Sequence, residues 1–354
     1  MSEPPTPLRE AGSCLLTGAS GFIGGHMAER LVRDGYAVRC LVRAGSERSR
    51  LRRLGVELVQ GDLTDARSLT AAVDGCRVVV HCAALVSDWA TTREIKHTNV
   101  AGTRNLLAAS SAASVERFVH VSSTDVYGHP GGAQLAESYT PSGFANWYAQ
   151  SKREAEAEVR RADALRTVIL RPATVYGPGS TEVVGEIARA LRAGHMLLID
   201  KGRTIAGLCY VENLIDAAML ALVRPEAVGH AFNISDGLPV TWRQFTDDLA
   251  VGLGCGPARL SMPYPLASAV GFSLEYGYRL LRSCTGLRTS PLLSRQAVQV
   301  LGVDQAFSTD AAHQVLGWEP RVGYEPALAA TIAWLEGWLD DRTPQRARAR
   351  RAAR

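Results

Sequence analysis

The stretch Ser13-Cys-Leu-Leu-Thr-Gly-Ala-Ser-Gly-Phe-Ile-Gly24 decides the fold. A short apolar run ends at Thr17, glycines follow at 18, 21 and 24, and helical periodicity then runs from His26 to Arg33. Strand, glycine turn and helix in direct succession are the context of a dinucleotide-binding turn. Glycines permit the tight turn and a close backbone approach to a pyrophosphate, whose charge the helix N-terminus attracts.

Apolar runs alternate with amphipathic segments through the first half of the chain. They predict strands at 36–42, 56–60, 77–82, 117–121 and 167–170, and helices at 92–113 and 146–163. This alternation indicates an α/β fold with a doubly wound parallel sheet, whose ligands bind beyond the carboxyl ends of the strands. The pattern loosens after about residue 175, which indicates a smaller C-terminal α/β lobe.

We therefore divide the chain into four parts. The expected divisions are a disordered leader at 1–12, a Rossmann domain at 13–175 with returning segments near 205–235, a substrate-binding lobe over most of 176–340, and an arginine-rich disordered tail at 341–354. The leader is acidic and proline-rich, unlike a signal peptide.

Composition excludes several classes of function. The chain has 354 residues, of which 46% are hydrophobic and 21% charged, as in ordinary globular proteins. Six arginines lie in 342–354, and removing them from the net charge of +4 leaves the rest at −2, so no nucleic-acid partner is expected. Seven scattered cysteines without a Cys-x-x-Cys pair indicate reduced thiols, a cytoplasmic setting and no metal site.

One apolar segment, 263–281, leaves several interpretations open. It carries Glu275 and Arg279 and is interrupted by Pro265, Gly271 and Gly277. It can form ordinary core and lid, an interfacial helix, or a flap over an apolar pocket. No apolar run reaches the ~20 residues that a membrane-spanning helix needs, so peripheral contact is the only membrane association that we consider.

The end of the second predicted strand bears on the cofactor. NAD-specific sites usually place an acid there for the ribose 2′-hydroxyl, whereas this chain has Arg43, with Ser46 and Arg48 close behind. A guanidinium suits a 2′-phosphate, so NADP is favoured and NAD is the alternative.

Tyr148 and Lys152 stand four residues apart within Asn146-Trp-Tyr-Ala-Gln-Ser-Lys152. On a helix they share one face, where the ammonium can stabilise the phenolate for proton transfer. The pair alone is a weak signal, because a tyrosine and a lysine one turn apart are common on solvated helices.

Further motifs give that pair a context. They are Thr17-Gly-Ala-Ser-Gly-Phe-Ile-Gly24, Gly61-Asp-Leu63, His97-Thr-Asn-Val-Ala-Gly-Thr103, Val121-Ser-Ser-Thr-Asp-Val-Tyr-Gly128, Tyr148-x-x-x-Lys152 and Leu170-Arg-Pro172. In this order and spacing the chain resembles the extended short-chain dehydrogenase/reductase family from about Cys14 to Trp338. The family commonly forms homodimers, which implies a dimer through the helices near 92–113 and 146–163.

The resemblance implies roles for individual residues. Tyr148 is the general acid or base, Lys152 supports Tyr148 and the nicotinamide ribose, and Ser123 binds the reacting oxygen. The implied cofactor residues also include Gly18, Ser20, Gly21, Phe22, Ile23, Gly24, Arg43, Asp62, Leu63, Ala83, Ala84, Asn99, Ser122, Pro172 and Val175. Leu85, Thr124 and Thr174 join Ser123 and Tyr148 as implied substrate residues.

Departures from the family patterns select a branch. Nucleotide-sugar members often carry Asn where this chain has Thr174, and the sugar dehydratases carry Thr-Asp-Glu where it has Ser123-Thr-Asp125. The segment Val38–Arg43 resembles the NADP-using dihydroflavonol reductase type. The segments 291–297, 306–310 and 316–320 resemble the C-terminal part of the 3β-hydroxysteroid dehydrogenase-like branch, whose substrates are apolar.

We therefore expect an NADP-dependent oxidoreductase that interconverts a secondary alcohol and a ketone of a hydrophobic molecule. Steroid-like, polyketide-like and 3-oxo acid compounds are the candidate substrates. The alternatives are a nucleotide-sugar epimerase with tightly bound NAD and a non-enzymatic dinucleotide-binding regulator.

Overall fold

A seven-stranded sheet forms the centre of the protein in the computed structural model, which describes residues 12–86, 90–132, 134–141, 143, 146–285 and 294–341. All pairings in this sheet are parallel and follow the order β10-β6-β5-β4-β1-β2-β3. The strands are β1 (Ser13–Thr17), β2 (Val38–Val42), β3 (Glu57–Gln60), β4 (Cys76–His81), β5 (Arg117–Val121), β6 (Thr167–Pro172) and β10 (Ala231–Ile234).

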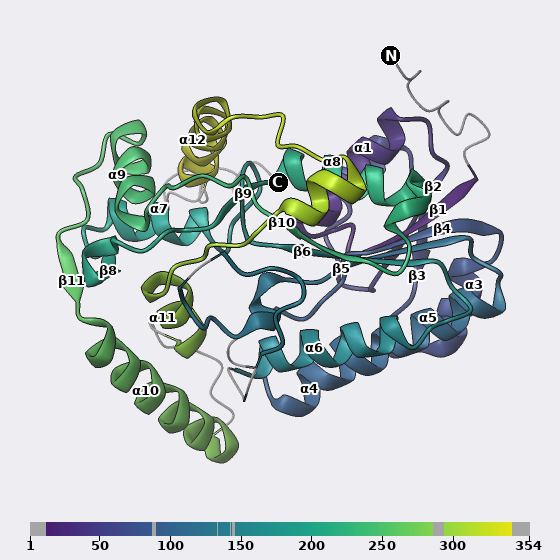
Figure 1. The fold of residues 1–354 in the computed structure, drawn as a ribbon, viewed down its shortest axis with the longest axis horizontal. Helices are drawn as coiled ribbons and strands as arrows, with labels where there is room; N and C mark the ends of the chain where they lie inside the picture. Colours follow the sequence, from purple (N-terminus) through teal and green to yellow (C-terminus); the bar gives the residue numbers. More distant parts are fainter. Residues whose placement is uncertain are drawn as a thin grey trace, which may run out of the picture.

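Helices cover both faces of the sheet (Figure 1). One face carries α3 (Ala66–Val73), α4 (Thr92–Lys96), the π-helical turn η1 (His97–Ala101), α5 (Gly102–Ala112) and α6 (Trp147–Arg160). The other carries α1 (Phe22–Arg33) and α8 (Val211–Val223), with α2 (Ser49–Leu54) against α1. Strands buried on both sides need continuous apolar sequence, and β5 and β6 are buried throughout.

Shorter elements build the smaller lobe at the left of Figure 1. Two parallel strand pairs, β7 with β9 and β8 with β11, replace the long sheet there. The lobe and its connections comprise η2 (Thr124–Tyr127), β7 (Thr174–Tyr176), α7 (Val184–Arg192), β8 (Leu197–Ile199), η3 (Asp200–Gly202), β9 (Leu208–Tyr210), η4 (Pro225–Ala227), α9 (Trp242–Gly252), β11 (Leu260–Met262), α10 (Tyr264–Thr285), α11 (Arg295–Gly302), η5 (Ala312–Leu316) and α12 (Tyr324–Asp341).

The predicted doubly wound fold is confirmed, and one local expectation is wrong. Pro265, Gly271 and Gly277 do not interrupt their segment, because α10 runs continuously from 264 to 285. Pro265 lies in the first helical turn, where a missing N–H costs little, and Gly271 packs closely on α11 near Val298. The division into a Rossmann domain at 13–175 and a lobe at 176–340 remains a prediction.

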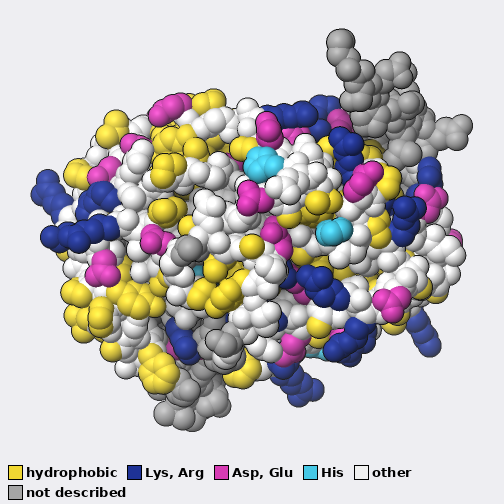
Figure 2. All heavy atoms as spheres, in the orientation of Figure 1, with side chains coloured by type: hydrophobic (Ala, Val, Ile, Leu, Met, Phe, Trp, Pro, Cys, Tyr) yellow, Lys and Arg dark blue, Asp and Glu magenta, His cyan; other side chains and the backbone are white. Residues whose placement is uncertain are grey.

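The surface of the protein shows no strong separation of charge in the view of Figure 2. Charged side chains of both signs are interspersed over the face in Figure 2, with an apolar area at its lower left. Within the described ranges, no helix is both long and apolar enough to span a bilayer. The predicted disordered leader, apart from Gly12, and the tail at 342–354 lie outside the described residues.

Candidate active site

The glycine turn at 18–24 has the close packing that a bound pyrophosphate needs. Gly18 has φ +74°, and a Cβ there would lie 2.7 Å from the backbone nitrogen of Ala83. A Cβ on Gly24 would collide with the Gly18 carbonyl oxygen. No side chain caps the N-terminus of α1 at Gly21, so its first N–H groups are available to an anion. The turn therefore fits a dinucleotide.

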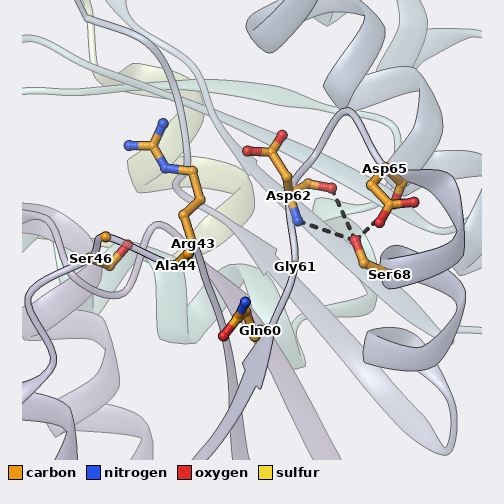
Figure 3. Close-up of a pocket in the computed structure, with 9 residues that line it drawn as sticks. Arg43, Ala44, Ser46, Gln60, Gly61, Asp62, Asp65 and Ser68 are labelled. Atoms are coloured by element: carbon orange, nitrogen blue, oxygen red, sulfur yellow. Dashed lines mark hydrogen bonds between the residues drawn. The ribbon is translucent and has the colours of Figure 1, made fainter.

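A cavity of about 640 Å³ lies at the carboxyl ends of β2 and β3, the two strands that follow β1 across the sheet. Figure 3 shows Arg43 and Asp62 rising from the two strand ends in the same direction. The lining residues are Arg43, Ala44, Gly45, Ser46, Gln60, Gly61, Asp62, Asp65 and Ser68. Arg43, Asp62 and Asp65 give the cavity a charged, polar lining.

The loop around this cavity is held by its own side chains. Arg48 donates to the Arg43 carbonyl oxygen at 2.8 Å, so it fixes the loop on which Arg43 stands. Ser68 Oγ accepts from the Asp62 N–H at 3.1 Å and donates to the Asp65 carbonyl oxygen at 2.8 Å. Although burial opposes ionisation, hydrogen bonds from Thr64 lower the pKa of Asp62 below its ordinary value.

A buried hydrogen-bond chain links the strand ends to the segment around Asn99. The Ala83 N–H donates to Thr17 Oγ1 at 3.3 Å, and Thr17 Oγ1 lies 2.7 Å from His81 Nδ1. His81 Nε2 lies 2.9 Å from Thr103 Oγ1, which donates to the Asn99 carbonyl oxygen at 2.6 Å. Each hydroxyl has one proton, so His81 accepts at Nδ1 and donates from Nε2. Burial lowers its pKa to about 3, which keeps the ring neutral.

Asn99 joins three parts of the site through its side chain. Its Oδ1 accepts from the Leu85 N–H at 2.7 Å, and its Nδ2 donates to the Leu85 carbonyl oxygen at 3.1 Å and to Ser151 Oγ at 3.0 Å. The π-helical turn η1 carries it, as is frequent at functional sites. Asn99 thus ties the loop after β4 to helix α6.

Tyr148 and Lys152 lie on α6 as the spacing predicts. Asn146 caps this helix, since its Oδ1 accepts from the Ala149 N–H at 2.8 Å. Lys152 Nζ lies 5.8 Å from the centroid of the Tyr148 ring and donates to the Val121 carbonyl oxygen at 3.0 Å. Burial lowers the pKa of Lys152 to about 8, although Glu156 and Asp125 oppose that shift.

Ser123 stands just beyond the carbonyl that Lys152 binds. It caps η2, with its Oγ accepting from the Asp125 N–H at 3.1 Å. The Asp125 carboxylate forms an ion pair with His129, with 2.7 Å between Oδ1 and Nε2. Although burial opposes both charges, this pairing lowers the pKa of Asp125 and raises that of His129. The Asp125 carboxylate and the Lys152 ammonium thus stabilise each other's charge next to Ser123.

The remaining predicted residues occupy the strand ends around this centre. Ala83, Ala84 and Leu85 follow β4 and are half-buried, whereas Ser20 is exposed at the glycine turn. Pro172 ends β6, and Thr174 and Val175 begin β7. Further positions are Phe22 and Ile23 at the start of α1, Leu63 after β3, and Ser122 and Thr124, both buried, on either side of Ser123.

Two glutamines on α11 reach the site without a motif that predicts them. Gln296 Nε2 donates to Asp125 Oδ2 at 3.2 Å, and Gln299 Oε1 accepts from Asn146 Nδ2 at 3.2 Å. Both contacts join positions more than 150 residues apart, so spacing alone carries no signal for them. Helix α11 therefore brings two side-chain amides to the residues around the start of α6.

Comparison with known proteins identifies the family. The family model described as the NAD dependent epimerase/dehydratase family matches residues 14–235, most of the chain. The chain belongs to the NAD dependent epimerase/dehydratase family. The match covers the glycine turn, Ser123, Tyr148 and Lys152, and agrees with the geometry of the site.

Two curated relatives and one solved structure are similar over nearly their whole length. A 4-hydroxy-2-methyl-3-oxo-4-farnesyl-3,4-dihydroquinoline-1-oxide ketoreductase of Stigmatella aurantiaca is 32% identical over 89% of this chain and 94% of its own. A 3 beta-hydroxysteroid dehydrogenase/Delta 5-->4-isomerase of Mycobacterium tuberculosis is 32% identical over 92% and 90%. MoeE5, solved with UDP-glucose and NAD, is 25% identical over 93% and 100%, with TM-score 0.72. The protein is accordingly an oxidoreductase of the extended short-chain type that uses a nicotinamide dinucleotide.

Proposed function

We propose that the protein interconverts a ketone and a secondary alcohol on a hydrophobic small molecule, with NADP as cofactor. The observation that carries this proposal is the buried Lys152, whose Nζ lies 3.0 Å from the Val121 carbonyl oxygen and 5.8 Å from the Tyr148 ring. A buried cation beside a tyrosine can stabilise the phenolate, which suits proton transfer.

Tyr148, Lys152 and Ser123 have separate roles at the substrate oxygen. The bound nicotinamide supplies the hydride for the carbonyl carbon, or accepts it in the reverse direction. Tyr148 gives its hydroxyl proton to the carbonyl oxygen during reduction, and the Lys152 ammonium stabilises the phenolate that remains. Ser123 donates a hydrogen bond to the same oxygen and stabilises the charge that develops there. Asn99 holds the loop at Leu85 and helix α6 in register.

Preference for NADP is proposed from the end of β2. Arg43 follows Val42 directly and faces the cavity of about 640 Å³, with Ser46 beside it. Such a guanidinium binds a 2′-phosphate with charge-assisted hydrogen bonds. We expect Arg43→Ala to reduce kcat/KM for NADPH about 10- to 100-fold, the size of one or two such bonds, while NADH turnover changes little. Equal losses with both cofactors would contradict this role.

A hydrophobic substrate is proposed from the relatives. The two enzymes named above act on a farnesylated quinoline oxide and on a 3 beta-hydroxysteroid, according to their names. Sterol-like, polyketide-like and 3-oxo acid compounds are therefore the first panel to test. Thr174 stands where nucleotide-sugar enzymes often have an asparagine, which disfavours the epimerase alternative.

The decisive experiment follows NADPH consumption with this ketone panel for wild type and Tyr148→Phe. We expect the variant to lose at least about 100-fold in rate, as removal of a general acid does. Tyr36→Phe is the matched control and should retain activity, because Tyr36 precedes β2 and so lies at the amino ends of the strands, away from the site. Equal rates for wild type and Tyr148→Phe would refute the assignment. Copurified NAD with turnover of a UDP-sugar would favour the epimerase instead, and cofactor binding without any turnover would favour a regulator.

The helices α5 and α6 are our proposal for a homodimer interface. Arg104 and Glu158 pair across these two helices at 2.9 Å, so α5 and α6 lie side by side on one face of the sheet. Sedimentation of the full chain tests the proposal, which a monomer would contradict.

A further inference from the structure

Helix α10 packs on other described elements along one side and carries exposed apolar side chains elsewhere on its surface. Its inner side packs on α11 and β8 through a small cluster of Ala267, Val298 and Ile199. Leu266 and Leu274 of the same helix are 53% and 40% exposed. A surface helix normally places charged residues on its outer side, and a helix that is apolar all round is normally buried.

Exposed large apolar side chains concentrate at this helix. Six are exposed among the described residues, and four of them lie between 260 and 274 (Leu260, Leu266, Phe272 and Leu274). Between Arg259 and Arg279 the sequence has a single charged residue, Glu275. In Figure 2 the apolar area at the lower left corresponds to α10 in Figure 1. Contiguous apolar area of this kind marks an interaction surface.

Basic side chains border this apolar surface at the N-terminal end of α10. Lys201, Arg203 and Arg259 are all exposed. The Lys201 N–H donates to Ser261 Oγ at 2.9 Å, which places η3 against β11 immediately before α10. The neighbouring acid, Asp200, is also exposed, and its Oδ1 accepts from the Tyr264 N–H at 3.1 Å, so three cations lie beside one carboxylate there. Dark blue side chains accordingly lie at the left edge of Figure 2, next to the apolar area.

We propose that α10 and the basic residues at its start bind the surface of an anionic lipid bilayer. A helix with one apolar side and flanking cations lies in the interfacial plane, with its apolar residues below the headgroups. The cations at Lys201, Arg203 and Arg259 complement acidic headgroups. No described helix is suited to span a bilayer, so the helix lies on the surface. This inference is independent of the substrate and of catalysis.

A second copy of the chain fits this surface less well than a bilayer does. A twofold contact through α10 places the same patch of each copy against the other. Where the twofold axis passes near the start of α10, beside the exposed Leu260 and Leu266, the contact brings Lys201, Arg203 and Arg259 close to their equivalents in the second copy. Like charges brought together in this way oppose association.

Flotation of the full chain with vesicles tests the proposal. Vesicles made of two parts phosphatidylcholine and one part phosphatidylglycerol are compared with vesicles of pure phosphatidylcholine. Each basic residue near an anionic surface raises binding about fivefold, so three of them give roughly a 100-fold preference for the anionic vesicles. Failure of the wild type to float with anionic vesicles, or equal binding to both kinds, overturns the proposal.

Variants separate the apolar from the electrostatic part. Leu266→Glu with Leu274→Glu should reduce binding at least about tenfold, whereas Val251→Glu should not, although Val251 is 82% exposed at the end of α9. Unfolding midpoints by circular dichroism show whether each variant is folded. Unchanged flotation of the folded double variant overturns the proposal.

The charge variants have their own matched pair. Arg203→Glu with Arg259→Glu should lower anionic binding at least about 25-fold, whereas Arg52→Glu with Arg53→Glu, exposed on α2, should have little effect. Equal losses in the two double variants mean nonspecific attraction and overturn the proposal. A dimer in solution that Leu266→Glu with Leu274→Glu dissociates means that a second copy covers α10, which also overturns it.

Discussion

Replacing Lys152 by methionine should stabilise the cofactor-free protein near neutral pH while abolishing activity. Lys152 is 4% exposed, and burial lowers its pKa from 10.5 to about 8. The unfolded chain therefore binds more protons than the folded one between about pH 8 and pH 10.5, and stability rises with pH across that window. Below pH 8 the full cost of burying the cation is present.

The size of the effect follows from the pKa. A shift of about 2.5 units costs about 3 kcal/mol near pH 7 and only about 1 kcal/mol near pH 10. Methionine removes this cost but leaves the Val121 carbonyl oxygen without its donor, a loss of about 1 kcal/mol. We therefore expect Lys152→Met to be about 2 kcal/mol more stable than wild type near pH 7.

Urea unfolding of both proteins at several pH values measures this difference. The advantage of the variant should shrink by about 2 kcal/mol between pH 7 and pH 10, because the wild-type lysine loses its proton. Lys201→Met, at an exposed site on η3, is the control and should differ from wild type by a constant amount. A difference between wild type and Lys152→Met that stays constant with pH would refute the reasoning.

Two further predictions concern packing around the site. Glu156→Gln should lower the free energy of unfolding by about 3 kcal/mol, because it leaves the buried Arg171 guanidinium without its charge partner. In the wild type, two Arg171 nitrogens lie 2.9 Å and 2.6 Å from the Glu156 carboxylate oxygens. Chemical denaturation measures the loss, and a value below about 1 kcal/mol would contradict the prediction. Gly24→Ala should lower the free energy of unfolding by several kcal/mol and weaken dinucleotide binding, because its Cβ would collide with the Gly18 backbone. Gly25→Ala is the control, since a Cβ there would meet only the flexible end of the Arg50 side chain. Similar unfolding midpoints for the two variants would exclude this explanation.

The inner strands of the central sheet were predictable because they are buried on both faces, as β5 and β6 are throughout. Strand β5 is predicted at 117–121 and observed there, while the first helix begins at Phe22, four residues before the periodic pattern at His26. Helix ends depend on backbone hydrogen bonds that hydrophobic periodicity does not report. The continuity of α10 was missed for a related reason, since a glycine weakens a helix but tertiary packing on α11 compensates.

The second layer around the catalytic candidates was not predictable from spacing. His81 reads as one apolar-strand residue among several, yet it joins Thr17 to Thr103 through both ring nitrogens. Asn99 was expected as a cofactor residue, and its partners at Leu85 and Ser151 are set by the folded sheet. Chemistry dictates the residue types that touch substrate, whereas the residues behind them need only a partner that the fold brings within reach.

The electrostatics of Lys152 show why that second layer matters. A fully buried ammonium would lose its proton well below neutral pH if burial acted alone. Glu156 lies one helical turn beyond Lys152, and Asp125 approaches from η2, and both raise the pKa against burial, so that it settles at about 8. Each acid is held in turn, Glu156 by Arg171 and Asp125 by His129. The cation that Tyr148 requires near pH 7 is therefore sustained by two ion pairs, neither of which touches the substrate oxygen in the proposed mechanism.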